Sequence, residues 1–186
     1  MKKQTMRKSK KQTGFTIVEA LIVIVILAIV LGVAYNRYAN WKQSNNREIV
    51  KNMITKVLDN APQTRNARGS FDGVNNAYVY NSARLSLSNH RSPTANQFIT
   101  PYSSNGITWE AVNGATLLDG TTLSATNQYL KGTIHSVPQA LCVDTVEDFI
   151  DKVLEVQVAG TRITHANTAT QCAAAGTTTD IAVIGQ

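Results

Sequence analysis

The stretch KKQTGFTIVEALIVIVILAIVLGVAY, residues 10–35, decides how the rest of this chain can fold. It joins a basic segment to an apolar run that extends from Phe15 to Ala34. Twenty helical residues rise about 30 Å, the thickness of the hydrocarbon core of a bilayer. Glu19 is the only charged residue inside the run. A carboxylate in lipid is unfavourable unless it has a partner, so its presence needs an explanation.

The net charge of the chain is concentrated before the apolar run. The 186 residues carry a formal charge of +6, and residues 15–186 contain as many acidic as basic side chains. The first fourteen residues hold these basic side chains and no acidic one: Lys2, Lys3, Arg7, Lys8, Lys10 and Lys11. Such a flank predicts that the N-terminus stays in the cytoplasm while the rest is translocated. The neutral body argues against nucleic acid as a partner.

Three kinds of N-terminal segment compete to explain this pattern. A cleaved secretory signal has a shorter apolar region and an A-x-A-like site at its end, and neither is present here. A signal anchor fits the apolar run and the basic flank, but it leaves Glu19 unexplained. The third interpretation is a leader that is cleaved before the apolar run, at Gly14.

The helix is predicted to continue beyond the apolar run as an amphipathic segment. Apolar residues recur on one helical face: Val50, Met53, Ile54, Val57, Leu58 and Ala61. Pro62 should end the helix near Asn60. Such a stripe requires a globular body to cover it. The aromatic residues Tyr35, Tyr38 and Trp41 suit either a membrane-interface belt or packing between subunits.

The middle of the chain, residues 62–105, is polar and only weakly patterned. AYVYN (77–81) and the alternating ARLSLSNH (83–90) are interpreted as short strands. The arginines here have no interleaved aromatic residues and are predicted to be solvated surface: Arg65, Arg68, Arg84 and Arg91.

The second half is predicted to be mainly β structure, which makes the chain α+β, a long helix packed on an antiparallel sheet. Strands are expected at 105–114, which Asn-Gly turn signals bracket, and at 121–132, 153–160 and 180–186. A short helix is expected at about 138–151.

No group of residues predicts catalysis, and no cofactor or metal is expected. The histidines His90, His135 and His165 lack metal-ligand spacing. The helix at 138–151 has four acidic residues on its outer side: Asp144, Glu147, Asp148 and Asp151. A solvated helix face is favoured over a cation site, because the glycine-containing calcium loop is absent. In a chain with an export-type N-terminus, Cys142 and Cys172 predict one disulfide bond.

KKQTG followed by FTIVE resembles the processing site of type IV prepilins. The resemblance implies that prepilin peptidase cleaves after Gly14, that the new N-terminal residue Phe15 is N-methylated, and that Glu19 is the fifth residue of the mature chain. In that family this glutamate pairs with the terminal amine of a neighbouring subunit and sets the register of assembly. The competing interpretation is that Glu19 only reaches the membrane interface.

The C-terminal half is similar to that of the type IVb pilins, which include the toxin-coregulated, bundle-forming and conjugative thin pili. In those proteins two cysteines bound an exposed D-region, here residues 142–172. The first mature residue Phe15 and the short leader are instead typical of type IVa, so the subclass stays open.

The resemblance implies a structural subunit, a major pilin, of an extracellular filament that serves adhesion, aggregation or conjugative contact. It implies a leader at 1–14, a transmembrane or filament-core half-helix at 15–35, an amphipathic half-helix at 36–61 and a pilin-fold head at 62–186. The implied partners are copies of the chain, prepilin peptidase, the inner-membrane assembly platform and, before assembly, the membrane. The alternatives are a minor pilin, a type II secretion pseudopilin or, more distantly, a signal-anchored periplasmic binding protein or enzyme.

Overall fold

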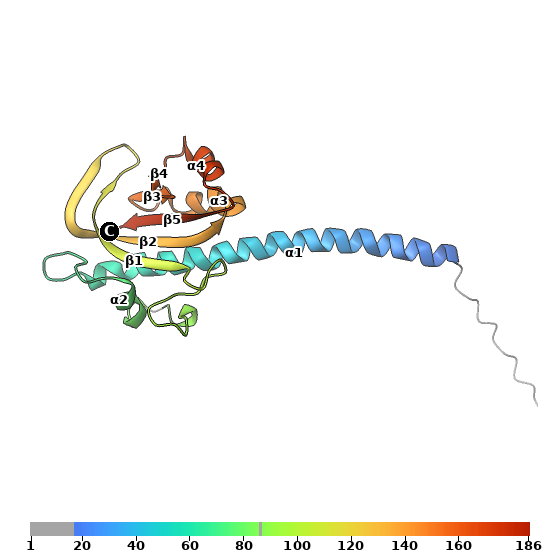
Figure 1. Ribbon diagram of the computed structural model, residues 1–186, viewed down its shortest axis with the longest axis horizontal. Coiled ribbons are helices and arrows are strands. Elements are labelled where there is room, and N and C mark those ends of the chain that lie inside the picture. The colour runs from blue at the N-terminus through green and yellow to red at the C-terminus, as the bar shows by residue number, and fades with distance from the viewer. Residues whose placement is uncertain (1–16, 86) are drawn as a thin grey trace, which may run out of the picture. The chain divides into compact units, whose positions relative to one another are not determined.

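The computed structural model describes residues 17–85 and 87–186, which belong to two compact units (Figure 1). The first unit ends at Lys42, and the second, called the head here, is Gln43–Gln186. Helix α1, Ile17–Asn60, contributes residues to both units. Its 44 residues agree with the predicted helix, including its end just before Pro62.

The head combines short helices with one antiparallel sheet, so the predicted α+β class is confirmed. The sheet has five strands in the order β1-β2-β5-β3-β4, and every strand pair is antiparallel. The elements after α1 are η1 Ala61–Thr64, α2 Asn76–Asn81, η2 Ser88–His90, β1 Ile107–Thr116, β2 Thr122–Pro138, α3 Gln139–Phe149, β3 Glu155–Val158, β4 Thr161–Arg162, α4 Thr168–Ala174 and β5 Thr178–Gly185.

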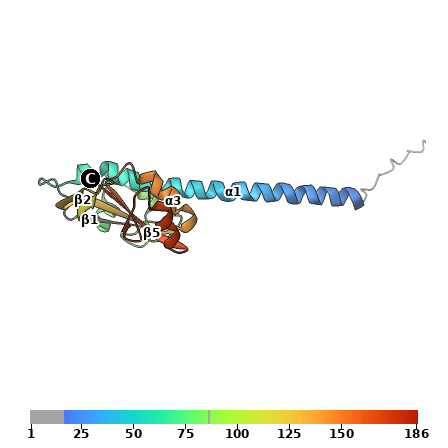
Figure 2. The same cartoon turned by 90° about the horizontal axis from the view of Figure 1, so that it is seen from above.

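The second half of α1 lies along the sheet and supplies one side of the main core (Figures 1 and 2). Most of the predicted apolar stripe is buried: Val50, Met53, Ile54, Val57 and Ala61. The helix approaches the last strand closely, since a Cβ added at Gly185 would lie 3.1 Å from Leu58 Cδ2. The stripe therefore holds α1 in the head by burial of apolar surface.

One face of the sheet is buried against this core, and alternate residues of four strands point into it. These are Ile107 and Trp109 in β1, Leu130 and Ile134 in β2, Ile181 and Val183 in β5, and Val156 and Val158 in β3. Gly132 lies opposite Trp109 in the β1–β2 register. A Cβ at Gly132 would come within 2.6 Å of Trp109 Cζ3, so the indole ring occupies the space that a side chain there would need.

Replacing Gly132 with alanine should therefore destabilise the head by about 1–3 kcal/mol, the usual cost of overpacking a core. Chemical denaturation of the purified protein measures this change. Thr133→Ala, at the adjacent half-buried position, is the control and should change stability by less than about 1 kcal/mol. Equal stability of Gly132→Ala and the wild type would contradict the packing described for Trp109.

The far end of the β1–β2 hairpin curls over the other face of the sheet (Figure 1). A smaller apolar cluster of Ala115, Tyr129 and Ile184 lies there. The backbone N–H of Thr116 donates to the carboxylate of Glu155. A predicted turn at Asn113-Gly114 is wrong, because β1 continues through a register shift between Val112 and Gly114.

The actual hairpin turn lies several residues later, where Gly120 has φ +92°. The Leu117 carbonyl accepts a hydrogen bond from Gly120 N at 2.9 Å and another from the Arg162 guanidinium. Glycine suits this position because a φ in that range is costly for other residues. Side chains of β3 and β4 thus hold the backbone of the hairpin end.

The outer edge of β1 is covered by the long segment between the helix and the sheet. Bridges join Asn75 to Glu110 and Phe98 to Ile107. The side-chain oxygen of Asn76 accepts a hydrogen bond from Trp109 N at 3.0 Å. This cover blocks the pairing of the edge with another chain.

Both strands predicted in this segment are wrong. Residues 76–81 form α2, because the Asn75 side chain caps the helix by accepting from Tyr78 N at 3.0 Å. Leu85 and Leu87 are buried but lie outside any strand, Leu85 in a turn and Leu87 just before the 3-10 turn Ser88–His90. The alternation of Leu85 and Leu87 arises because both side chains enter the main core, although the backbone that carries them is not a strand.

Arg65 and Arg91 are half-buried and so less solvated than predicted, whereas Arg68 and Arg84 are exposed as predicted. The Arg65 guanidinium lies 4.9 Å from the centroid of the Phe71 ring, and that of Arg91 lies 5.0 Å from the Tyr80 ring. These are cation–π contacts, which stabilise local packing. Arg84 remains exposed and donates to the Gln63 carbonyl.

Candidate functional site

Two of the residues predicted to direct processing, Gly14 and Phe15, lie outside the described residues. Glu19 is described and lies in the first turn of α1. A carboxylate is favoured in that turn because the positive end of the helix dipole is there. The structure thus places Glu19 at the start of the apolar helix, four residues after Phe15 in the sequence.

The first half of α1 presents a continuous apolar surface. Every large apolar side chain from Ile17 to Val33 is exposed, the least exposed being Val23 at 43%. An 18-residue window of this helix has a mean hydropathy of 3.1 and none of it is buried, so by length and composition the helix can cross a membrane. A surface this apolar requires lipid or other apolar helices as its environment.

Aromatic residues follow this apolar surface. Tyr35, Tyr38 and Trp41 are all exposed, and the rings of Tyr38 and Trp41 lie 6.0 Å apart. Amphipathic rings at this position suit a membrane boundary or a contact with a second apolar helix, as the sequence predicted.

An ion-pair cluster joins α1 to α3 just inside the head. Arg47 lies 2.8 Å from Asp144 and 3.1 Å from Asp148, and Lys51 lies 3.1 Å from Asp148. The side chain of Asp148 is only 13% exposed, whereas that of Asp144 is 54% exposed. The prediction that the acidic residues of α3 form a solvated face is therefore wrong for Asp148. Its ion pairs attach α3, the helix that contains Cys142, to α1.

Tyr102 borders the same cluster. Its hydroxyl is buried and has no hydrogen-bond partner among the described residues. Burial raises the pKa of Tyr102 to about 12, with a smaller opposing effect from the positive charge of Arg47. The phenol therefore stays neutral and does not compete with Asp148 for the two cations.

Asp148→Asn should destabilise the head by about 1–3 kcal/mol, because it leaves two cations facing a neutral amide in a partly buried place. Asp144→Asn is the matched control, and its exposed pair should contribute less than about 1 kcal/mol. Urea denaturation of both variants measures the difference. Equal effects would show that burial does not distinguish the two acids.

The predicted disulfide is present between Cys142 of α3 and Cys172 of α4. Both cysteines are buried, and the bond closes a loop of 30 residues. Gln139 supports the same junction by donating to the Ala173 carbonyl at 2.9 Å. Because both sulfurs are oxidised, neither is a cysteine nucleophile.

The loop bounded by the disulfide mixes regular and irregular structure. It contains β3, the two-residue strand β4 and the start of α4. The reversal after β3 places both Ala159 and Gly160 at positive φ. Asn167 organises the following turn by accepting from Thr164 N at 2.7 Å and donating to the Arg162 carbonyl.

The three histidines lie in separate places, and no group of three or more metal-ligating side chains occurs within 17–85 and 87–186. His135 contacts Asp180 and Thr108, each at 2.9 Å, and so connects β2 to β5 and β1. His165 pairs with Asp151 at 3.0 Å on the surface. These partners are far apart in sequence, and for His135 the pairing of β2 with β1 and β5 brings them together.

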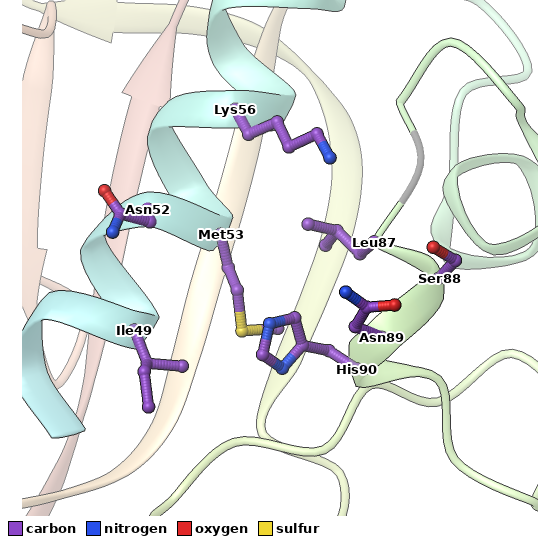
Figure 3. Close-up of a pocket in the computed structure, with 8 residues that line it drawn as sticks. All are labelled: Ile49, Asn52, Met53, Lys56, Leu87, Ser88, Asn89 and His90. Carbon is purple, nitrogen blue, oxygen red and sulfur yellow. The ribbon is translucent and has the colours of Figure 1, made fainter. Parts of the chain in front are cut away.

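His90 lines a groove of about 200 Å³ between α1 and the turn at η2 (Figure 3). Lys56 and Met53 extend from α1 toward this turn, and the His90 ring extends from the turn toward α1. The remaining lining residues are Ile49, Asn52, Leu87, Ser88 and Asn89. Burial and, to a smaller extent, the charge of Lys56 lower the pKa of His90, which leaves Lys56 as the cation of the groove at neutral pH.

Comparison with known proteins adds one match, which is confined to the N-terminal part. Residues 9–35 match the prokaryotic N-terminal methylation motif. A comparison of the chain with curated proteins finds no similar sequence. The match includes Gly14, Phe15 and Glu19 and ends before the head. With the apolar helix, the motif points to a membrane-anchored precursor, and the chain therefore begins with a prepilin signal of the type IV pilin kind.

Proposed function

We propose that this chain is the major structural subunit of a type IV pilus. Prepilin peptidase removes residues 1–14 by cleaving after Gly14, and Phe15 becomes the N-methylated first residue. The subunit waits in the inner membrane with its head in the periplasm and then joins an extracellular filament. The assembly platform in the inner membrane and further copies of the chain are its partners.

The observation that carries this proposal is the junction of two surfaces within one helix. The half of α1 that matches the methylation motif exposes all its large apolar side chains. The other half buries its stripe in a folded, disulfide-bonded head. A membrane suits the first half before assembly, and parallel copies of the same half-helix provide an equally apolar environment afterwards.

Glu19 supplies the register in this proposal. Leader removal creates an amine at Phe15 that is largely protonated near neutral pH, because its ordinary pKa is about 8. A carboxylate at low dielectric is strongly favoured beside such a cation. An incoming subunit is therefore most stable at the axial position where Glu19 and the amine of its neighbour meet.

The remaining parts take the roles implied by the family. Residues 15–35 form the filament core, residues 36–61 connect this core to the outer layer, and residues 62–186 form the outer layer. The D-region, residues 142–172, faces outward and makes contacts in adhesion, aggregation or conjugation. The disulfide between α3 and α4 and the final strand β5 favour a type IVb subunit.

Three features favour a filament subunit over the alternatives. A tip-located minor pilin often lacks the glutamate, and Glu19 is present. A type II secretion pseudopilin seldom has the C-terminal disulfide, and Cys142–Cys172 is present. A signal-anchored enzyme or binding protein leaves the motif at residues 9–35 without a role.

Electron microscopy of shear-released surface material, with mass spectrometry of its subunits, tests the proposal. Thin filaments that contain this chain as the main component support a major pilin. Filaments that contain it as a trace component would overturn that assignment in favour of a minor pilin. Its complete absence from filaments of producing cells would overturn the proposed function.

A further inference from the structure

The charged residues of the head are almost all paired within the head itself. Each carboxylate there contacts a cation, a histidine or a hydrogen-bond donor, with two exceptions among the described residues, Asp59 and Glu147. Both exceptions are exposed, Asp59 on α1 and Glu147 on α3. An exposed charge without an internal partner can form a pair with another molecule.

Among the cationic side chains of the described head, Lys56 and Arg68 have no ion pair, side-chain hydrogen bond or aromatic-ring contact. Arg68 lies in a polar hollow that also contains Asp72, so this hollow is close to neutral. Lys56 lies in the groove of Figure 3, which no acidic residue lines. The Lys56 groove is therefore the more attractive place for an incoming carboxylate.

The shape of the Lys56 groove suits a glutamate side chain. Met53 and Leu87 are buried apolar residues that border it, and they can receive methylene groups. Asn52 and Asn89 are exposed amides that can donate to a carboxylate beside Lys56. The groove thus combines an apolar lining with a cationic and polar rim.

We propose that Glu147 of one copy of this chain binds in the Lys56 groove of the next copy, an inference that rests on the proposed filament function. Glu147 and Lys56 lie on different surface regions of the head, α3 and the groove beside η2. A contact between two different regions is heterologous and can repeat without closing, which is the geometry of a filament. Asp59 lies three residues from Lys56 on the same helix. A contact between Asp59 of one copy and Lys56 of another would therefore join the same surface region of both copies and give a closed dimer.

Charge exchange in producing cells tests this contact. Lys56→Glu and Glu147→Lys should each reduce the yield of sheared filaments about tenfold or more, because each places like charges together. The double exchange should restore the yield to within about threefold of wild type. The matched controls Asp59→Lys and Arg68→Glu reverse the other two unpaired charges and should leave the yield within about twofold. Normal filament yield from both single variants would overturn the proposal.

Carbodiimide cross-linking of wild-type filaments gives a test that needs no variant. It should join Lys56 and Glu147 by an amide bond in filaments and not in detergent-solubilised monomers, as peptide mapping would show. Wild-type filaments without this cross-link would overturn the contact while the filament function stands. Producing cells whose filaments lack the chain would instead overturn the proposed function, and the contact with it.

Discussion

Replacing Glu19 with alanine is expected to abolish surface filaments while leaving leader removal intact. In the proposed function the cleavage site lies before Phe15, whereas the carboxylate acts only when one subunit meets the next. Its loss removes the ion pair that distinguishes the correct axial position from neighbouring ones in an apolar medium. Sheared filament yield, measured with the processing state of membrane-bound subunits, reports both effects.

The control for this prediction is Val18→Ala, which trims the adjacent apolar side chain without changing the charge. Val18 is exposed in the first turns of the same helix. Its variant should assemble to within about threefold of wild type, since surface substitutions of this size have small effects. Wild-type amounts of filaments from Glu19→Ala would contradict the register role, and uncleaved Glu19→Ala would assign the residue to processing instead.

Removing the disulfide should produce the largest loss of head stability. The bond between Cys142 and Cys172 closes a 30-residue loop, and such a loop restricts the unfolded chain by about 3–4 kcal/mol. The double variant Cys142→Ala/Cys172→Ala should lose about this amount, which for a domain of this size lowers the melting temperature by about 10 °C. Thermal unfolding of the purified protein measures the shift.

Two comparisons separate the covalent effect from packing. The reduced wild type retains both buried sulfurs, so it should lose most of the same stability. The Asp148→Asn variant disturbs α3 without touching the disulfide and should lose about 1–3 kcal/mol. A loss below about 1 kcal/mol in the double cysteine variant would contradict the role assigned to the bond.

Elements with a regular apolar period could be predicted from the sequence. The α1 stripe, helix α3 within 138–151, and strands β3 and β5 were expected close to their observed bounds. In each of them the side chains that face the core recur with the period of the backbone, so neighbouring residues are enough to predict which side chains are buried. The disulfide also followed from two cysteines in an exported chain.

The errors occur where a capping side chain or a strand partner determines the structure against the local composition. Asn75 caps α2, although β-favouring tyrosine and valine follow it. Asn113-Gly114 has the composition of a turn, yet pairing with β2 continues past it. In both places a local signal was overruled by a capping hydrogen bond or by strand pairing.

Some residues of the candidate site could be predicted from the sequence, and others could not. Gly14, Phe15 and Glu19 could be recognised because they lie within five residues of one another, and the motif at 9–35 includes all three. The role of Asp148 could not be recognised, because its partners Arg47 and Lys51 lie about a hundred residues earlier in the chain.

The charge pairing of the head has a consequence for assembly in the proposed filament. Arg47 and Lys51 are occupied by α3, so they stabilise the head and contribute little to contacts between copies. Lys56 and Glu147 keep their charges available for a neighbour. In this account the apolar half of α1 supplies the affinity, Glu19 the axial register and the head charges the orientation.

Mass spectrometry of the N-terminal peptide from the mature protein tests the central claim most directly. The account predicts that the first residue is Phe15 carrying one methyl group on its amine, with residues 1–14 absent. Recovery of a mature chain that still begins at Met1 would contradict the account, because Glu19 would then have no terminal amine at Phe15 with which to pair.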